Sequence, residues 1–540
     1  MTPQTEMHPQ RWGDPAAATS LPDTARGLIE LVFGIDEQPA VDGATPPAPT
    51  VGAEALTALE AVVGPDQVLV DDAIRTLRTR GKSTPDLLKA RAGDLTDAPD
   101  VVVRPAGQAE IEAVLAVAAA HRLAVVPFGG GTSVVGGVDP ESGSHALVVA
   151  LDLERTAALL ELDETSLLAT FGAGTTGPQA EELLATRGYT LGHFPQSFEY
   201  ATIGGFAATR SSGQASRGYG RFDDVVHALR VATPVGELSL GRAPASAAGP
   251  DLRELFLGSE GAFGVLTEVT VRIRPVAAVT RYGAWTFPDF ASGAEAVRLL
   301  TQRGIRPTVL RLSDETETRV NAVMGAHLTR LRGCLAVATF EGATPDEAGS
   351  AADATDTLFA AHGGRSRGED PARSWERGRF APPALRDALL DIGVLAETLE
   401  TASRWADLPG LKRAVTDALT AALTAEGTKP IVLCHISHVY PAGASLYLTG
   451  VSALWDDPLA QWGRATDAAS RAIGSAGGTI THHHAVGRDH SAYLEGEIGA
   501  VGVDILRAVK NALDPRGIMN PGVLVPAASP HRGASGDHSA

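Results

Sequence analysis

Between Val101 and Pro275, short apolar runs alternate with amphipathic stretches, and this pattern predicts strands and helices in turn. The predicted strands are residues 101–103 (VVV), 124–128 (AVVPF), 145–152 (HALVVALD) and 165–174 (TSLLATFGAG). Between the first two, the apolar residues at 111, 114, 115 and 118 follow the spacing of an amphipathic helix. A second helix is predicted at 178–187. A β-α-β unit therefore leads directly into a glycine-rich run.

The rest of the chain predicts an α+β protein with several parts. Residues 229–238 (LRVATPVGEL) indicate a β-hairpin. After residue 276, helical stretches (291–301, 346–362, 412–425) alternate with strand candidates (335–342, 430–440, 444–449). Before Pro99 the pattern indicates helices, including a short amphipathic one at 24–32. We expect five parts: a helical extension (1–96), a strand–helix domain (97–275), an α+β domain (276–480), a C-terminal segment (481–525) and a disordered tail (526–540).

The run VVPFGGGTSVVGGV, residues 125–138, has the composition of a diphosphate cradle. Glycines let backbone N–H groups converge on an anion, and the hydroxyls of Thr132 and Ser133 can donate further hydrogen bonds. No lysine follows, so this is not a Walker A loop, and no G-x-G-x-x-G with a long helix is present. A glycine-rich turn without a ligand is the alternative.

Two further Gly/Ser/Thr clusters follow, within residues 194–226 and 255–264. The first is long for a connection, and long ordered loops in compact domains usually carry function. Three such clusters within about 140 residues indicate one ligand that several loops surround. A ligand of that length with a diphosphate is a dinucleotide.

Composition argues against several classes of binding partner and against a membrane-spanning or secreted protein. The net charge of −19 argues against a nucleic acid or an anionic membrane surface as partner. Two cysteines give no disulfide framework, no apolar run is long enough for a transmembrane helix, and no signal peptide is recognised, so we expect a globular cytoplasmic protein. The basic stretch 75–89 is the one candidate for peripheral membrane contact, and a homodimer is left open.

Taken in order, these motifs resemble the vanillyl-alcohol-oxidase type of FAD-binding flavoprotein, with PFGGGTS as the diphosphate loop and GSEGAFGVLTEVTVRIRP as a second signature. Within that type, the likeness is closest to the alkyldihydroxyacetonephosphate synthase family. It is carried by RPTVLRLSD (306–314), HVYPAGASLYLT (438–449), THHHAVG (481–487) and DPRGIMNPGVL (514–524). The resemblance implies a PCMH-type FAD domain of two subdomains at 97–275, and a substrate or cap domain with an antiparallel sheet at 276–480.

The resemblance also implies which residues hold FAD. They are Pro127, Phe128, Gly129, Gly130, Gly131, Thr132, Ser133, Gln196, Ser197, Phe198, Glu199, Tyr200, Ala201, Thr202, Thr209, Arg210, Ser211, Ser212, Gly258, Ser259, Glu260, Gly261, Ala262, Phe263 and Gly264. Many relatives bind FAD covalently through histidine or cysteine. The diphosphate loop contains neither, so we expect non-covalent FAD.

Tyr440 and the triple histidine are the expected catalytic groups. A phenol is a weak base in water, with a pKa of about 10, yet beside a cation or flavin it can exchange a proton, and the family gives the tyrosine of this motif that role. On an extended chain only His482 and His484 would share a side, with His483 opposite. Two histidines without carboxylate or cysteine make a poor zinc site, so we expect no metal. Imidazoles that line the flavin, and hold phosphate or stabilise reduced flavin, are the better interpretation.

Two arginines are candidates for substrate binding. Arg311 alternates with Leu310 and Leu312 on a strand, and a guanidinium that points inward suits phosphate or carboxylate. In the family an arginine follows the tryptophan of the stretch matching ETASRWADL, but here Asp407 stands two residues past Trp405 and Arg404 precedes it. Arg404 is therefore the weaker candidate, and Ala485 replaces the family's glycine after the histidines.

The implied reaction uses flavin without net redox. An acylated dihydroxyacetone phosphate forms an adduct at flavin N5, the acyl chain leaves as a fatty acid, and a fatty alcohol takes its place, which gives an ether lipid precursor. The alternative is an FAD-dependent oxidase or dehydrogenase of a 2-hydroxy acid or related alcohol on the same scaffold. A non-catalytic nucleotide-binding protein is a third interpretation, against which the His, Tyr and Arg motifs argue.

Overall fold

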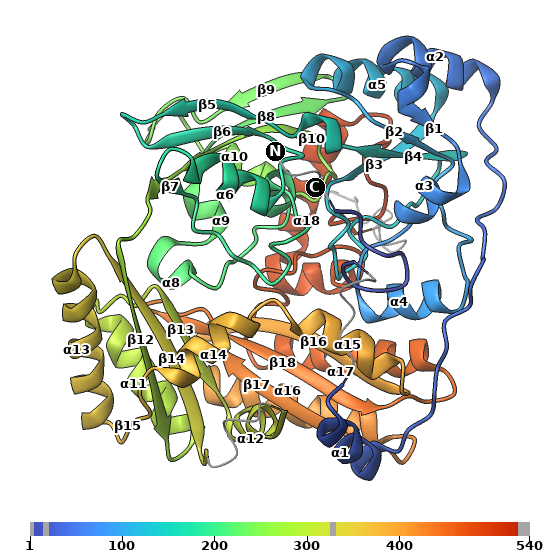
Figure 1. Ribbon diagram of the computed structural model, residues 1–540. Coiled ribbons are helices and arrows are strands. Elements are labelled where there is room, and N and C mark those ends of the chain that lie inside the picture. The colour runs from blue at the N-terminus through green and yellow to red at the C-terminus, as the bar shows by residue number, and fades with distance from the viewer. Residues whose placement is uncertain (1–4, 15–20, 325–330, 527–540) are drawn as a thin grey trace, which may run out of the picture.

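The computed structural model describes residues 5–14, 21–324 and 331–526. Two sheets from the first half of the chain form one side of the molecule and a seven-stranded sheet forms the other (Figure 1). The C-terminal segment, red in the figure, runs between the two sides (Figure 1). The predicted α+β class is confirmed. The predicted tail lies almost wholly outside the described residues.

The first sheet has the order β1-β2-β4-β3, in which β2, β4 and β3 run parallel and β1 is antiparallel. Its strands are β1 (Val68–Leu69), β2 (Val101–Val103), β3 (Leu123–Phe128) and β4 (Leu147–Asp152). Helix α5 (Gln108–His121) crosses from β2 to β3 and buries the face predicted for it. β4 inserts between β2 and β3, so the glycine run begins at the end of an edge strand. The chain before Pro99, expected to be helical only, also contributes β1.

The second sheet is antiparallel, with the order β5-β6-β10-β8-β9. Its strands are β5 (Leu159–Asp163), β6 (Leu168–Gly172), β8 (Val226–Thr233), β9 (Gly236–Leu240) and β10 (Val265–Arg272). The hairpin predicted at 229–238 is confirmed, with Thr233 opposite Gly236. The surrounding elements are α6 (Gly177–Ala185), β7 (Tyr189–Thr190), α7 (Ile203–Ala208), α8 (Ser216–Tyr219), α9 (Phe222–Val225), α10 (Arg253–Phe256) and β11 (Arg274–Pro275).

The cap sheet has seven antiparallel strands in the order β15-β12-β14-β13-β17-β18-β16. They are β12 (Val279–Phe287), β13 (Val309–Ser313), β14 (Cys334–Gly342), β15 (Arg365–Ser366), β16 (Val394–Arg404), β17 (Ile431–Ile436) and β18 (Gly443–Ala453). The helices are α11 (Phe290–Gln302), α12 (Glu315–Met324), α13 (Pro345–Ala361), α14 (Asp370–Gly378), α15 (Pro382–Leu390), α16 (Leu408–Thr424) and α17 (Pro458–Ser475). A large apolar core joins one face of the sheet to α11, α13, α16 and α17.

The C-terminal segment returns to the first sheet after α18 (Leu494–Leu513). Met519 forms a parallel β-bridge with Val125. In this bridge the Val125 amide donates to the Ile518 carbonyl at 2.8 Å. The side-chain amide of Asn520 donates to the carbonyls of Gly137 and Glu260 at 2.9 and 2.6 Å. This segment therefore completes the edge from which the glycine run departs. No helix of the described residues is long and apolar enough to span a membrane.

The N-terminal extension contains α1 (Asp23–Phe33), α2 (Ala53–Val63), α3 (Asp72–Leu77) and α4 (Thr84–Arg91). Its basic stretch, 75–89, which the sequence offered as a candidate for peripheral membrane contact, has most of its cations buried. Arg75, Arg78 and Lys82 are 2%, 3% and 6% exposed. Arg78 pairs with Asp152 and Glu6, and Lys82 donates to the His8 carbonyl at 2.6 Å. These cations therefore bind groups inside the protein, and Arg78 links the extension to β4 of the first sheet.

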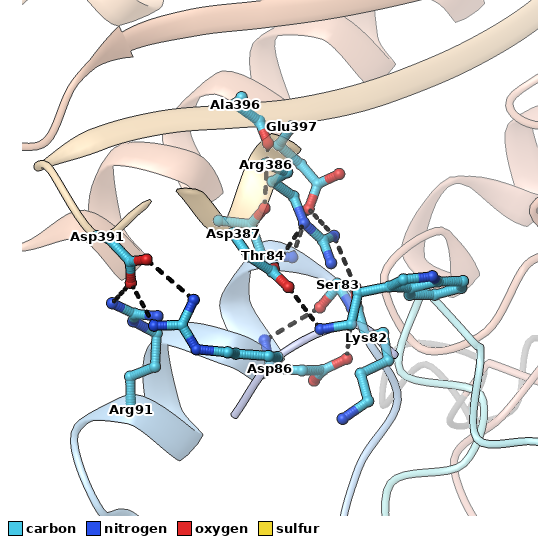
Figure 2. A network of polar contacts seen from close by, with 12 residues as sticks. Lys82, Ser83, Thr84, Asp86, Arg91, Arg386, Asp387, Asp391, Ala396 and Glu397 are labelled. Carbon is cyan, nitrogen blue, oxygen red and sulfur yellow. Dashed lines mark hydrogen bonds and ion pairs between the residues drawn. The ribbon is translucent and has the colours of Figure 1, made fainter. Parts of the chain in front are cut away.

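A polar network fastens the N-terminal segment, residues 8–12, and α4 to the cap (Figure 2). Asp391, just after α15, accepts from Arg11 at 2.8 Å and from Arg91 at 2.7 Å. The Trp12 amide donates to Asp387, and the Thr84 amide donates to Glu397 of β16. Ser83 and Asp86 form a reciprocal capping box that starts α4 at this junction. The network therefore ties the N-terminal extension to the cap.

We expect Asp391→Asn to lower the free energy of unfolding by about 1–3 kcal/mol, because the nearly buried Arg91 then loses its charged partner. Chemical denaturation measures this loss, and limited proteolysis should cut earlier within residues 5–14. Glu37→Gln is the matched control, since Glu37 forms an exposed ion pair with Arg26 whose loss should cost less than about 0.5 kcal/mol. Equal stability of the two variants would contradict the role of the network.

Candidate active site

The glycine loop after β3 requires glycine for close approach. A Cβ on Gly130 would overlap the carbonyl oxygen of Tyr200, and one on Gly129 would lie 2.6 Å from the Thr202 hydroxyl oxygen. Gly131 has φ +65° and lies against the Phe128 ring. The loop therefore packs directly on residues 200–202, the second cluster that the sequence identified.

Backbone amides of this loop are free to bind a ligand. Within the described chain, no backbone N–H from Gly130 to Ser133 donates to another protein group. The carbonyl of Ser133 is fixed from behind by the Lys82 amide at 2.6 Å. Adjacent free amides at a strand end form an anion-binding nest, so the residues present fit the diphosphate of FAD.

The glycine loop, residues 195–214 and residues 260–264 surround one end of a cavity of about 880 Å³. The predicted FAD residues that line this cavity are Pro127, Gly129, Gly130, Gly131, Thr132, Ser133, Gln196, Ser197, Ala201, Thr202, Thr209, Ser211, Ser212, Glu260, Gly261 and Gly264. The side chain of Thr202 caps α7 through the Gly205 amide. The three clusters thus meet at one site, as a shared ligand demands.

Other predicted FAD residues do not line this cavity. They are Phe128, Phe198, Glu199, Tyr200, Arg210, Gly258, Ser259, Ala262 and Phe263. Phe198 stacks on Phe380, and Arg210 pairs with Asp223. Gly258 has φ +83°, and a Cβ there would meet the Arg210 side chain. For these residues direct contact with FAD stays a prediction, and the contacts seen here shape the loops.

The three consecutive histidines lie in a turn, and the buried carboxylate of Glu400 holds that turn in place. Glu400 on β16 is 3% exposed and accepts from the amides of His482, His483 and His484 at 2.6, 2.8 and 2.7 Å. The Thr481 hydroxyl adds a fourth hydrogen bond at 2.7 Å. Burial alone would raise the pKa of Glu400, but the histidines and amides around it lower that pKa below its ordinary value. The carboxylate therefore stays ionised and fixes three side chains at once.

This turn corrects the expectation that His482 and His483 point to opposite sides. Their Nδ1 atoms lie 2.9 Å apart, and His438 joins them, with its ring stacked on His482 at 5.0 Å. The nitrogens of the three histidines lie within 4.8 Å of one another, so the premise of only two histidines was also wrong. However, 2.9 Å is shorter than the roughly 3.4 Å between nitrogens on a tetrahedral zinc, and Nδ1 of His438 already meets the hydroxyls of Ser212 and Ser216. A shared proton accounts for the close pair more simply than a metal does.

Tyr440 connects to this cluster. Its hydroxyl lies 2.7 Å from Nε2 of His482, whose Nδ1 meets His483. Burial raises the pKa of Tyr440 to about 12, against the opposing effect of the Arg221 guanidinium. Burial also lowers the pKa of His482 and of His483 to about 4, although Glu400 opposes this. Near pH 7 these two imidazoles are therefore neutral.

Only some of these hydrogen-bonded side chains line the cavity. His483, His484 and His438 do, whereas Tyr440 and His482 stand behind them. The contacts Tyr440–His482–His483 therefore form a relay of hydrogen-bonding groups that ends at the cavity.

Arg311 points into the cavity from β13, as the strand pattern predicted. Its guanidinium donates to Glu317 at 2.9 Å and approaches Nδ1 of His435 at 3.0 Å. Glu317 is 5% exposed, and although burial alone would raise its pKa, His435 and Arg311 lower it below the ordinary range. Much of the Arg311 charge is thus already balanced inside the protein.

Arg404 does not join the site. Its side chain is 82% exposed, pairs with Asp407 at 2.8 Å and does not line the cavity, so its placement gives no support to substrate binding. The neighbouring Trp405 has a clearer function, because its indole N–H donates to the carbonyl of Tyr440 at 3.0 Å. The tryptophan of this stretch therefore positions the tyrosine.

Sequence reasoning missed Glu400, Arg221 and His438. Arg221 donates to the His482 carbonyl at 2.9 Å and pairs with Asp223. Glu400 lies in β16, which was not predicted as a strand because glutamates and threonines interrupt its apolar positions. His438 was within a quoted motif, yet nothing in the sequence indicated that it would contact the distant triple histidine.

Gly130→Ala should yield protein with little bound flavin, because the new methyl group overlaps the Tyr200 carbonyl and displaces the loop. The flavin-to-protein absorbance ratio after purification measures this. Gly410→Ala in α16 is the control, since a Cβ there meets nothing within 4 Å, and it should keep its flavin. Full flavin occupancy in Gly130→Ala would show that this loop does not hold the cofactor.

Glu400→Gln should cost about 1–3 kcal/mol of stability, because an amide cannot accept all four hydrogen bonds of the carboxylate. Hydrogen exchange should accelerate in the peptide 481–485, which separates a local loss from general unfolding. Glu268→Gln, at a half-exposed ion pair with Arg230, is the control. Unchanged exchange at 481–485 would mean that Glu400 does not organise the turn.

Comparison with known proteins agrees with this geometry. Residues 99–240 match the FAD binding domain family, and residues 276–524 match the family of FAD linked oxidases, C-terminal domain. The alkyldihydroxyacetonephosphate synthase of Trypanosoma brucei brucei is 33% identical over 89% of this chain and 82% of its own length. That of Dictyostelium discoideum is 30% identical over 93% and 86%.

A solved structure of alkyldihydroxyacetonephosphate synthase superposes with a TM-score of 0.84 and 27% identity, over 96% of this chain and 98% of that one. The p-cresol methylhydroxylase structure, at 16% identity and a TM-score of 0.66, shares the fold. The PCMH-type architecture and the FAD cofactor expected from the sequence are thereby confirmed. The chain belongs to the alkyldihydroxyacetonephosphate synthase family of FAD-dependent enzymes.

Proposed function

We propose that the protein exchanges the acyl group of an acylated dihydroxyacetone phosphate for a fatty alcohol, as the names of its relatives suggest. The observation that carries this proposal is the make-up of the cavity. Its lining combines the FAD loops, the imidazoles of His438, His483 and His484, and an apolar wall. A substrate with a polar head and a long alkyl chain suits such a space.

The apolar wall comes largely from α1 and α15. It contains Ala25, Leu28, Ile29, Val32, Phe33, Leu385 and Leu389. Leu28 and Val32 are still 44% and 46% exposed, so α1 lies where the cavity meets the surface. Burying a methylene group gains about 0.8 kcal/mol, which makes an apolar channel of this kind a strong site for a fatty chain.

Bound FAD supplies the reactive centre, and the proposed exchange involves no net oxidation. The residues of the chain handle the proton that the fatty alcohol loses when its oxygen forms the ether bond. Neutral His483 at the cavity accepts that proton, and His482 and Tyr440 extend the relay behind it. Glu400 keeps the imidazoles in register, and its negative charge stabilises a transient imidazolium. Water is kept out by the apolar wall.

The test is an anaerobic assay of purified holoprotein with an acyl-dihydroxyacetone phosphate and a fatty alcohol. We expect release of fatty acid, formation of the alkyl ether and an oxidised flavin spectrum at the end of the reaction. Absence of product, with persistent bleaching of flavin by a 2-hydroxy acid, would overturn the proposal.

The second candidate is an FAD-dependent oxidase or dehydrogenase of 2-hydroxy acids or related alcohols. Arg311, His435 and Tyr447 lie together on the cavity wall, with the His435 and Tyr447 rings stacked at 4.8 Å. A guanidinium beside an imidazole suits a small carboxylate and a nearby hydroxyl. The extent of the apolar wall favours the lipid substrate instead.

With this function we propose non-covalent FAD in a cytoplasmic enzyme that meets its substrate at a membrane surface. The diphosphate loop has no histidine or cysteine, and both cysteines are buried in the cap sheet outside the cavity lining. Leu31 on the outer side of α1 is 81% exposed, so α1 rather than residues 75–89 is the candidate for membrane contact. Acid precipitation should release the yellow flavin into the supernatant.

Tyr440→Phe should lower kcat by about 10²–10⁴-fold, since the phenol at the end of the relay is lost while the ring remains. Steady-state kinetics measure this, and flavin content should not change. Tyr282→Phe is the control: Tyr282 bonds Glu376 in the cap and does not line the cavity. A Tyr440→Phe enzyme with native kcat would exclude the hydroxyl from the mechanism.

A further inference from the structure

Among the described residues, four arginines line the cavity: Arg311, Arg319, Arg379 and Arg386. Arg311 is paired with Glu317, and Arg386 donates to the Lys82 carbonyl between the carboxylates of Asp387 and Glu397. Arg319 is exposed on α12. Arg379, just after α14, is half-buried, and no carboxylate of the described residues lies within ion-pair distance of it.

The carboxylates nearest to Arg379 are engaged elsewhere. Glu376 accepts from the Tyr282 hydroxyl at 2.7 Å, and Glu341 accepts from the Tyr219 hydroxyl. Burial lowers the pKa of Arg379, while Glu376 and Glu341 only partly oppose this effect. The structure therefore keeps a desolvated cation without a direct anionic partner.

The position of Arg379 is nevertheless well defined. Its guanidinium lies over the rings of Phe194 and Phe380, at 4.8 and 4.9 Å from their centroids. Its carbonyl accepts from the side-chain amides of Gln196 at 2.8 Å and Gln214 at 3.2 Å. Both glutamines belong to the loops that surround the FAD end of the cavity. A guanidinium held by its faces leaves its N–H edge available for a ligand.

We propose that Arg379 binds the anionic head group of the substrate and fixes which end of it lies beside the flavin loops. The ligand chemistry is a phosphate, and the inference rests on the proposed function in that a phosphate-bearing substrate enters this cavity. A planar guanidinium can hold two phosphate oxygens at once, which positions the head group while the alkyl chain follows the apolar wall. The diphosphate of FAD has the same chemistry and is the other source of such an anion.

The experiment compares native holoprotein with Arg379→Gln and Arg379→Lys. The probes are dihydroxyacetone phosphate and uncharged dihydroxyacetone, whose binding is followed by perturbation of the flavin spectrum without any turnover. We expect Arg379→Gln to weaken dihydroxyacetone phosphate by about tenfold to a hundredfold, with flavin affinity unchanged. Arg379→Lys should recover part of the loss, because it restores the charge but not the paired donors. The KM for the acylated phosphate should rise with little change in kcat.

Arg377→Gln is the matched control, since Arg377 is an exposed arginine of the same helix and does not line the cavity. It should bind the phosphate probe as the native protein does. Loss of flavin in Arg379→Gln would assign the guanidinium to the cofactor and overturn the proposal, as would native affinity for the phosphate probe. If the native protein binds the probe through Arg379 but makes no ether product, the proposed reaction fails while the anion site stands.

Discussion

The hydrogen bonds to the Glu400 carboxylate are the interaction on which the rest of the site depends. A buried carboxylate is unfavourable unless several donors surround it, and here three successive amides and one hydroxyl do so. Because the donors belong to consecutive residues, the carboxylate imposes a turn on them. The turn brings His482 and His483 into contact, which an extended chain would forbid. The order of the relay is thus a consequence of one strand residue, about eighty positions earlier.

Two long-range contacts place this turn beside the cofactor loops. Glu260, in the third glycine cluster, accepts from the amides of Val486 and Gly487 at 3.1 and 2.7 Å. Asn520 then bonds the carbonyls of both Gly137 and Glu260. The glycine loop, the histidine turn and the C-terminal segment therefore support one another. A substitution that displaces one of these three segments should therefore also displace the other two.

The sequence predicted those features whose cause is local. Amphipathic spacing located α5, a turn pair located the β8–β9 hairpin, and glycine clusters located the FAD loops. The arrangement of the catalytic groups could not be predicted in this way, because His438 meets His482 through contacts more than forty residues apart in sequence. Strand β16 was missed because its buried positions include the polar residues Glu397, Glu400 and Thr401, so its sequence lacks the apolar alternation typical of a strand. The buried cations at 75–89 were misassigned because their partners lie in other parts of the chain.

The electrostatics of the cavity follow from how its charges are paired. The histidines are held neutral by burial, and Arg311 is balanced by Glu317, so neither provides a strong anion site. An anion that enters a cavity of low dielectric must lose its hydration, and only a cation without a competing carboxylate can replace it. Arg379 meets that condition because the nearby carboxylates of Glu376 and Glu341 accept hydrogen bonds from tyrosine hydroxyls instead. The same apolar surroundings that leave Arg379 without a partner also favour an alkyl chain. One cavity can therefore orient a molecule that is anionic at one end and apolar at the other.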